Sequence, residues 1–162
     1  MDRRQLLKRL DTAWVAFNES YAGLSDAQLM VPGVTGEWSV RDILAHVTTW
    51  EEEALNHLPL ILKGGTPPRY SVRYGGIDAF NDLMTKQKRN LSLTEVREQL
   101  GATHGRLVEF LQNAPERQVP GDTRFVRRLR LDTYGHYPLH AEAIRQWRRC
   151  STGCRSGASP FD

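Results

Sequence analysis

Apolar side chains recur every three or four residues in four long segments of this chain, which favours helices packed against one another. The first segment steps by 3, 4, 3 and 4 residues through Leu7, Leu10, Trp14, Phe17 and Tyr21. In an α-helix such steps bring every member onto one face, which is then buried against a neighbouring element. The chain shows no convincing alternation of apolar and polar residues, which is typical of half-buried strands.

Three further segments repeat this pattern. The second is preceded by the helix-capping pair Ser39 and Asp42, and the third by the pair Ser92 and Glu95. We expect the second helix to end or kink at Pro59, because proline lacks the amide hydrogen that a helix uses. The three stripes are Val40, Ile43, Val47, Trp50 and Ala54; Leu93, Val96, Leu100, Leu107 and Leu111; and His136, His140, Ile144 and Trp147.

Long connections separate these helices. Glycine and proline in segment 63–76 predict a loop over one end of the fold, followed by a shorter helix that begins at Ile77. Segment 115–130 predicts a connection with extended pieces around Phe125 and Val126, and the last helix runs from about 132 to 149. The predicted fold is all-α, an antiparallel four-helix bundle with long connecting loops, and residues 1–149 form a single domain.

Residues 150–162 are small and polar, which predicts a disordered C-terminal tail. Cys150 and Cys154 fall in this tail, and we interpret them as free thiols and not as zinc ligands. They are the only two cysteines of the chain, so we expect a reducing, cytoplasmic environment.

Composition excludes several classes of protein. Of the 162 residues, 40% are hydrophobic and 25% are charged, which is ordinary for a globular domain and excludes a wholly disordered or collagen-like chain. The longest stretch without a charged residue covers positions 27–36, far short of the ~20 residues that a membrane span needs. The N-terminal segment alternates charges and leucines, which predicts a folded start and no signal peptide.

The net charge of +3 is unevenly distributed, because residues 124–155 hold eight arginines and only two acidic residues. A basic segment of this kind raises the hypothesis of nucleic-acid binding. However, the chain has no helix-turn-helix, zinc-finger or single-strand-binding motif, and aromatic residues do not interleave with the arginines. A solvated basic face, or a rim for an anionic ligand, is therefore favoured over a nucleic-acid interface.

Two histidines, His136 and His140, lie four residues apart on the stripe of the last helix. Side chains at this spacing converge, which is a common way to hold a divalent transition metal. His46 lies on the second helix, on its inward face or close to it. Three histidines from two packed helices leave open coordination positions, as in catalytic sites. The same spacing fits three buried, hydrogen-bonded histidines that bind no metal, so both interpretations stay open.

Pro138, between the two histidines of the last helix, also has two interpretations. Either it bends a helix that already contains His136 and aims that side chain into a cavity, or it lies in the first turn of a helix that starts near His136. Helical positions then predict further pocket-lining residues, while the acidic neighbours Glu51 and Glu52 are assigned mostly to a solvated face. These pocket candidates are Trp50, Glu53, His104, Tyr134 and Tyr137. For His104, a packed core position is the alternative.

Two arginine–tyrosine pairs lie between the two glycine pairs of loop 63–76, and they are Arg69, Tyr70, Arg73 and Tyr74. Glycine permits movement, while arginine and tyrosine offer anion pairing and flat apolar contact. The 115–130 connection adds Arg124, Arg127 and Arg128. If these loops close over the end that holds His136, the substrate carries a carboxylate or another anionic group. The alternative is that these are solvated loop arginines.

Three motifs in this order resemble the DinB/YfiT-like four-helix-bundle superfamily, with the DfsB/ClbS-like subgroup the most similar. They are Trp38–Glu51 (WSVRDILAHVTTWE), Asp78–Asn81 (DAFN) and His136–His140 (HYPLH). The resemblance covers about residues 3–149 and implies an up-up-down-down type of bundle, often a homodimer, with a pocket at one end. In metal-binding members this pocket holds nickel or zinc on three histidines, which correspond here to His46, His136 and His140.

Members of this superfamily include thiol-dependent transferases and isomerases, and resistance proteins that inactivate a reactive small molecule. The resemblance therefore implies a metal-dependent transferase or hydrolase acting on a small electrophile, with a low-molecular-weight thiol as a candidate co-substrate. The alternative is a non-catalytic small-molecule binding or resistance protein with a metal-free pocket. Neither hypothesis involves a membrane, and a nucleic-acid partner is not expected.

Overall fold

The computed structural model describes residues 1–153. Its helices are α1 (Arg3–Tyr21), α2 (Asp26–Leu29), α3 (Val40–Leu62), α4 (Tyr70–Arg73), α5 (Ile77–Lys88), α6 (Leu93–Asn113), α7 (Arg124–Asp132) and α8 (Tyr137–Gly153). A short 3₁₀ turn, Glu116–Gln118, precedes α7. Residues 1–153 contain no β-strand, so the predicted all-α fold is confirmed. Within the same residues, no helix combines the length and the apolar character that crossing a membrane requires.

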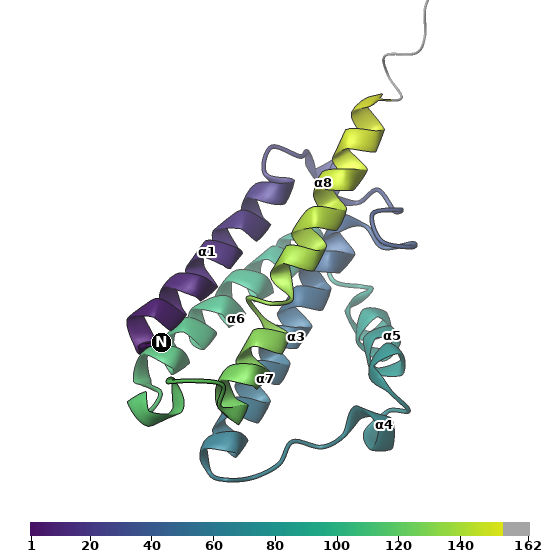
Figure 1. Ribbon diagram of the computed structural model, residues 1–162. Helices are drawn as coiled ribbons and strands as arrows, with labels where there is room; N and C mark the ends of the chain where they lie inside the picture. The colour runs from purple at the N-terminus through teal and green to yellow at the C-terminus, as the bar shows by residue number, and fades with distance from the viewer. Residues whose placement is uncertain (154–162) are drawn as a thin grey trace, which may run out of the picture.

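Four long helices, α1, α3, α6 and α8, form the bundle (Figure 1). Contacts at the helix ends give their directions. Arg3 at the start of α1 binds the carbonyl of Ala114 just after α6, and Arg41 near the start of α3 binds that of Leu91 just before α6. Helices α1 and α8 therefore run one way, and α3 and α6 run the other way (Figure 1). In chain order this is up, down, down and up, which differs from the order that the resemblance implies.

Short polar side chains begin most of these helices. Asp2, Ser25, Ser39 and Ser92 each accept a hydrogen bond from the amide three residues later, and the side chain at that position returns one to the cap amide. Each such capping box satisfies two amides that have no partner inside the helix. The boxes expected at Ser39 and Ser92 are therefore confirmed.

The apolar stripes meet in one core. Phe17 of α1, Ile43 of α3, Leu107 of α6 and Ile144 of α8 are fully buried, and each contributes roughly 1.5–3 kcal/mol by leaving water. Helix α5 buries only Phe80 and packs on the outside of α3 (Figure 1). It covers the side of α3 that carries His46, because His46 and the α5 residues Met84 and Thr85 line the same small cavity.

Residues 124–132 form helix α7, so the predicted connection with extended pieces is wrong over this part. Phe125, Val126 and Leu129 form its buried face against α3, while most of its arginines stay exposed. Thr123 begins the helix by accepting a hydrogen bond from the amide of Val126. The last helix, predicted to run from about 132, begins instead at Tyr137, which is five residues after the end of α7 at Asp132.

Three further boundaries differ from the prediction. Helix α3 continues past Pro59 to Leu62, because a proline removes only one hydrogen bond and the amide of Lys63 still donates to the Pro59 carbonyl. One helical turn, α4, forms inside the predicted loop 63–76. Helix α8 extends to Gly153, so Cys150 is an exposed free cysteine on a helix. Cys154 lies outside the described residues.

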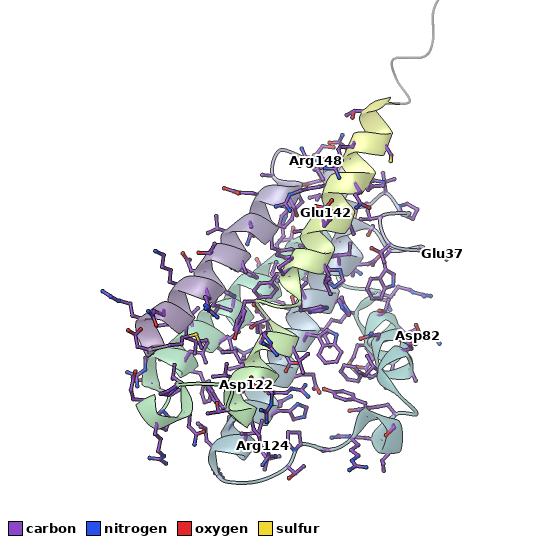
Figure 2. The ribbon with its side chains drawn as sticks, in the orientation of Figure 1. Glu37, Asp82, Asp122, Arg124, Glu142 and Arg148 are labelled. Atoms are coloured by element: carbon purple, nitrogen blue, oxygen red, sulfur yellow. The ribbon has the colours of Figure 1, made fainter. Side chains whose placement is uncertain are left out.

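Part of the basic segment stabilises the end of α1. Arg148 of α8 donates to the carbonyls of Ser20 and Ala22, and Figure 2 shows it beside that end of α1. Arg145 donates to the carbonyl of Ala16 at 3.1 Å. Cations are favourable at helix C-termini because the last carbonyl groups carry partial negative charge. These arginines therefore join α8 to α1.

Candidate metal centre

Three histidines that are far apart in the sequence meet at one point. His46 comes from the second turn of α3, His136 from the turn between α7 and α8, and His140 from the first turn of α8. The Nε2 atom of His136 lies 3.1 Å from Nε2 of His46 and 2.9 Å from Nε2 of His140. One nitrogen of each ring lies within 4.8 Å of the other two. This cluster is the only such group of three possible metal ligands within residues 1–153.

The chain breaks between α7 and α8, and this break presents His136. The amides of His136 and Tyr137 both donate to the carbonyl of Thr133, at 2.7 and 2.9 Å, and α8 starts at Tyr137. Pro138 is then the second residue of α8. An amide at this position has no carbonyl partner inside the helix, so a proline there costs no helical hydrogen bond. Of the two interpretations of Pro138, the structure supports the one that places it in the first turn of a helix.

Gly135 makes this turn tight. Its amide donates to the carbonyl of Arg130 at 2.9 Å, and a Cβ atom at position 135 would lie 2.7 Å from the same oxygen. Real Cβ atoms essentially never come so close to another heavy atom. The position directly before His136 is therefore restricted to glycine by backbone packing.

The three imidazoles cannot all be satisfied by hydrogen bonds among themselves. A neutral ring nitrogen either donates one proton or offers one lone pair in the ring plane. The Nε2 atom of His136 faces two other nitrogens, so it can form a well-directed hydrogen bond with only one of them. A divalent cation would accept one lone pair from each ring, and three imidazole nitrogens are a donor set that zinc and nickel prefer. The residues present therefore fit a transition-metal ion.

Burial keeps these rings neutral. It lowers the pKa of His46 to about 2, with smaller contributions from His140, His136 and Lys88. It also lowers the pKa of His136 to about 3, where His140 adds to the effect, and that of His140 to about 4. Neutral imidazole is the form that binds a metal, so the cluster is ready for a metal at neutral pH. The Nδ1 atom of His136 is buried without a hydrogen-bond partner.

Two tryptophans border the cluster. The ring centroid of Trp38 lies 4.7 Å from that of His46, and the centroid of Trp50 lies 6.0 Å from that of His136. The indole nitrogen of Trp50 donates to Oδ1 of Asn81 on α5 at 3.1 Å, which fixes the orientation of its ring. Of the predicted pocket residues, Trp50 is thus the one that stands beside the histidines.

A group of polar side chains lies beyond Trp50. Tyr70 of α4, whose ring centroid is 5.5 Å from that of Trp50, donates to Oε2 of Glu53 at 2.5 Å and accepts from Arg128 at 2.9 Å. Arg128 also binds Oδ2 of Asp132 at 2.6 Å. Burial raises the pKa of Asp132 to about 7, although Arg128 acts to lower it. Through its hydrogen bond with Tyr70, Glu53 connects α3 to α4, and it contacts Tyr70 instead of the histidine cluster.

The predicted rim residues divide into two sets. Tyr70 and Tyr74 are half-buried, and the ring centroid of each lies 4.9 Å from that of Phe80 on α5. Arg69 and Arg73 are exposed, and the guanidinium carbon of Arg73 lies 5.3 Å from the ring centroid of Tyr74. The tyrosines thus extend the aromatic surface next to Trp50, and the two arginines face solvent.

The two segments that were expected to close over the site contact each other. Arg124 donates to the carbonyl of Gly65 at 3.0 Å (Figure 2 shows it at the end of the bundle opposite Arg148). Arg128 binds Tyr70, as described above, while Arg127 forms an exposed ion pair elsewhere on α7. Loop 63–76 is therefore held to α7 by two arginines.

Glu51 is fully buried in the bundle core, so its assignment to a solvated face is wrong. Its Oε1 atom accepts from the hydroxyl of Tyr137 and lies 2.8 Å from Nδ1 of His104, whose ring stacks on Trp14 with centroids 3.6 Å apart. Its Oε2 atom has no partner. The pocket candidates His104 and Tyr137 thus contact this carboxylate and not the histidine cluster. Tyr134, the last candidate, lines a separate hollow between α1 and α8.

Sequence reasoning missed Glu51 and the Arg128–Asp132 pair. A signal for Glu51 was present, because it lies four residues after Val47 and three before Ala54, on the buried stripe itself. For the Arg128–Asp132 pair the helical spacing of four residues was a signal as well, but it was hidden by the interpretation of 115–130 as a connection.

A helical bundle with a three-histidine cluster defines the class of this protein, and comparison with known proteins defines the family. The sequence profile of the DinB superfamily matches residues 9–144, and the chain belongs to this superfamily. No curated protein sequence matches it.

Solved structures show the same fold. The sibling lethal factor precursor DfsB matches with a TM-score of 0.77 at 15% identity, over 93% of this chain and 97% of that one. The colibactin self-resistance protein ClbS, solved in complex with double-stranded DNA, matches with a TM-score of 0.77 at 14% identity, over 92% and 96% of the two chains. An uncharacterised protein from Escherichia coli UTI89 matches with a TM-score of 0.76 at 15% identity, over 93% and 95%. The predicted resemblance to DfsB and ClbS is confirmed for the fold.

Proposed function

We propose that this protein is a metal-dependent enzyme of the hydrolase or transferase type that acts on a reactive small molecule. The observation that carries the proposal is the convergence of one nitrogen each from His46, His136 and His140 within 4.8 Å. These three residues would hold a divalent nickel or zinc ion. Such an ion, when bound, acts as a Lewis acid and makes a nucleophile available near neutral pH.

The side chains around the cluster would bind the substrate. Trp50 and Tyr70 offer flat apolar surfaces for an organic molecule, with ring centroids 5.5 Å apart. The exposed Arg69 and Arg73, at the two ends of α4, would pair with a carboxylate or another anionic group of that molecule. In the transferase form of the proposal, a low-molecular-weight thiol is the second substrate.

A second candidate is a resistance protein that binds a small molecule without turnover in a metal-free pocket. The description of ClbS as a self-resistance protein favours this candidate. In that case the neutral histidines would accept or donate hydrogen bonds to the bound molecule. The two candidates differ in turnover and in metal dependence.

A turnover assay separates them. Purified protein is incubated with a panel of small electrophiles and with water alone, glutathione, bacillithiol or mycothiol as the nucleophile. We expect consumption of at least one electrophile that requires added zinc or nickel and is lost in His136→Ala. Stoichiometric binding without turnover, unchanged by a chelator, would instead support the resistance candidate.

A nucleic-acid partner is not part of this proposal, although ClbS was solved with double-stranded DNA. Arg145 and Arg148 donate to carbonyl groups of α1, so these two guanidinium groups are partly occupied within the fold. We expect no tight binding to duplex DNA at physiological salt. Binding whose affinity falls steeply as salt increases would identify phosphate contacts and would contradict this expectation. The homodimer that the resemblance implies stays a prediction, and sedimentation velocity tests it.

A further inference from the structure

A groove of about 780 Å³ lies between α1 and the start of α8. Its apolar floor consists of Ala13 and Ala16 of α1 with Tyr134 and Pro138, which are two residues before and after His136. None of the three clustered histidines lines it. The volume is within the range of small-molecule pockets, roughly 300–1,000 Å³. This groove is therefore distinct from the candidate metal centre, although the two share one turn of the chain.

The edge of the groove is positively charged. Lys8 and Arg9 line it, both are exposed, and neither forms an ion pair within residues 1–153. Burial raises the pKa of Tyr134, while Arg130 and Arg9 oppose this rise and Asp122 adds to it. In the described part of the chain, no acidic residue lines the groove.

An exposed apolar side chain follows the floor residue Pro138 in the chain, because Leu139 is 68% exposed. Exposed apolar surface next to a concave pocket commonly marks a binding site. Unpaired cations above such a floor are complementary to a molecule with an apolar body and one anionic head.

We propose that this groove is a second ligand site, which binds an amphipathic carboxylate with a medium-length alkyl chain. The alkyl chain lies along Ala13, Ala16 and Pro138, and the carboxylate pairs with Lys8 and Arg9. The proposal goes beyond the metal-dependent activity and does not rest on it, because no metal ligand lines this groove.

Isothermal titration calorimetry with octanoate tests the proposal on the full chain. We expect saturable binding of one octanoate per chain, and about tenfold weaker binding of 1-octanol, which lacks the charge. Acetate, which lacks the alkyl chain, should give no measurable binding. Octanoate affinity should be unchanged in His140→Ala and after treatment with a chelator.

Two variants locate the ligand. Lys8→Glu/Arg9→Glu should lower octanoate affinity about tenfold, whereas the same chemical change at the end of α5, Lys86→Glu/Arg89→Glu, should leave it within about twofold. Ala13→Trp fills the floor of the groove and should lower the affinity at least as much. If Ala13→Trp fails to fold, the charge-reversal pair at exposed positions still decides the question.

Several results would overturn the proposal. The first is that octanoate gives no binding heat, or that octanol binds as tightly as octanoate, which would mean that no charge is recognised. The second is that octanoate binding is lost in His140→Ala but kept in Lys8→Glu/Arg9→Glu, which would place the ligand at the metal centre. The third is that the wild type is a dimer that Ala13→Trp dissociates, which would make the groove an interface between two copies of the chain.

Discussion

The imidazoles of the histidine cluster and the carboxylate of Glu51 lie largely inside this bundle, and such groups are costly to bury unless they are neutral or have a partner. The imidazoles of the cluster have lowered pKa values and are neutral, so they can be tolerated without water. The carboxylate of Glu51 is tolerated because Tyr137 and His104 both contact it. The histidines therefore contribute to the pH dependence of stability, and Glu51 to its sensitivity to substitution.

The buried histidines predict that the metal-free protein loses stability in acid. Their pKa values lie between about 2 and about 4 in the folded state, below the ~6.5 of an unfolded chain. Between these values the unfolded chain binds more protons, so the free energy of unfolding falls as the pH decreases from about 6.5 towards 4. We expect roughly 1 kcal/mol per histidine per pH unit, and Asp132, whose pKa burial raises to about 7, offsets the contribution of about one histidine. Urea denaturation at several pH values measures this, and His140→Gln should make the loss shallower. A free energy of unfolding that is independent of pH over this range would contradict the prediction.

Glu51→Ala should destabilise the protein by about 3 kcal/mol. The substitution opens a cavity and leaves the Tyr137 hydroxyl and the His104 ring nitrogen without their partner in the core. Its neighbour Glu52 forms an ion pair with Lys88 near the surface, so Glu52→Ala is the matched control and should cost less than about 1 kcal/mol. Chemical denaturation of both variants measures the difference. Equal effects would show that Glu51 has no special role in the core.

At the scale of secondary-structure elements, the turn between α7 and α8 predicts a strict requirement for glycine. Gly135→Ala would place a Cβ atom 2.7 Å from the Arg130 carbonyl oxygen, which should cost about 2 kcal/mol. The same change should shift His136 and weaken zinc binding at least tenfold, as calorimetry would measure. Gly101→Ala is the control, because nothing lies within 4 Å of a Cβ there. It is expected to stabilise α6 by roughly 0.5–1 kcal/mol. A tolerated Gly135→Ala would refute this account of the turn.

Substitution of the two exposed arginines at α4 should affect ligand binding but not stability. Arg69 and Arg73 are exposed, so Arg69→Ala/Arg73→Ala should leave the melting temperature within about 1 °C, because surface substitutions cost little. If these arginines pair with an anionic substrate, the same change should weaken binding of that substrate about tenfold. Thermal melting and a binding titration measure the two effects. Unchanged affinity, or a loss of several degrees, would assign the arginines to the surface or to the fold.

Long elements could be predicted from the sequence, and short ones could not. Helices α1, α3 and α6 each repeat an apolar stripe over several turns, so their spacing outweighs local exceptions such as Pro59. Helix α7 has only nine residues, rich in arginine, and its amphipathic face becomes clear only once α3 is known to cover Phe125 and Leu129. Local pattern alone was insufficient there.

At the scale of the whole molecule, the packing of α3 against α8 brings His46 to a pair of histidines ninety residues later. The pair itself follows from helical spacing, but the contact with His46 depends on the order and direction of the helices. Trp50 could be predicted next to the cluster, because it follows His46 by four residues on the same helix. His104 and Tyr137 could not be separated from the cluster by spacing alone. Both face a buried acid whose position only the packed bundle shows.

The central claim is that three histidines of this bundle hold one divalent metal ion, and elemental analysis tests it most directly. Protein purified without a metal-affinity tag, and then equilibrated with zinc or nickel and desalted, should retain about one equivalent per chain and melt at a higher temperature, because a ligand that binds only the folded state stabilises it. Single substitutions to alanine of His46, His136 and His140 should each lose the metal, and His57→Ala, which changes a histidine outside the cluster, should keep it. Less than about a tenth of an equivalent in the wild type, with no change in melting temperature on adding either metal, would contradict the claim.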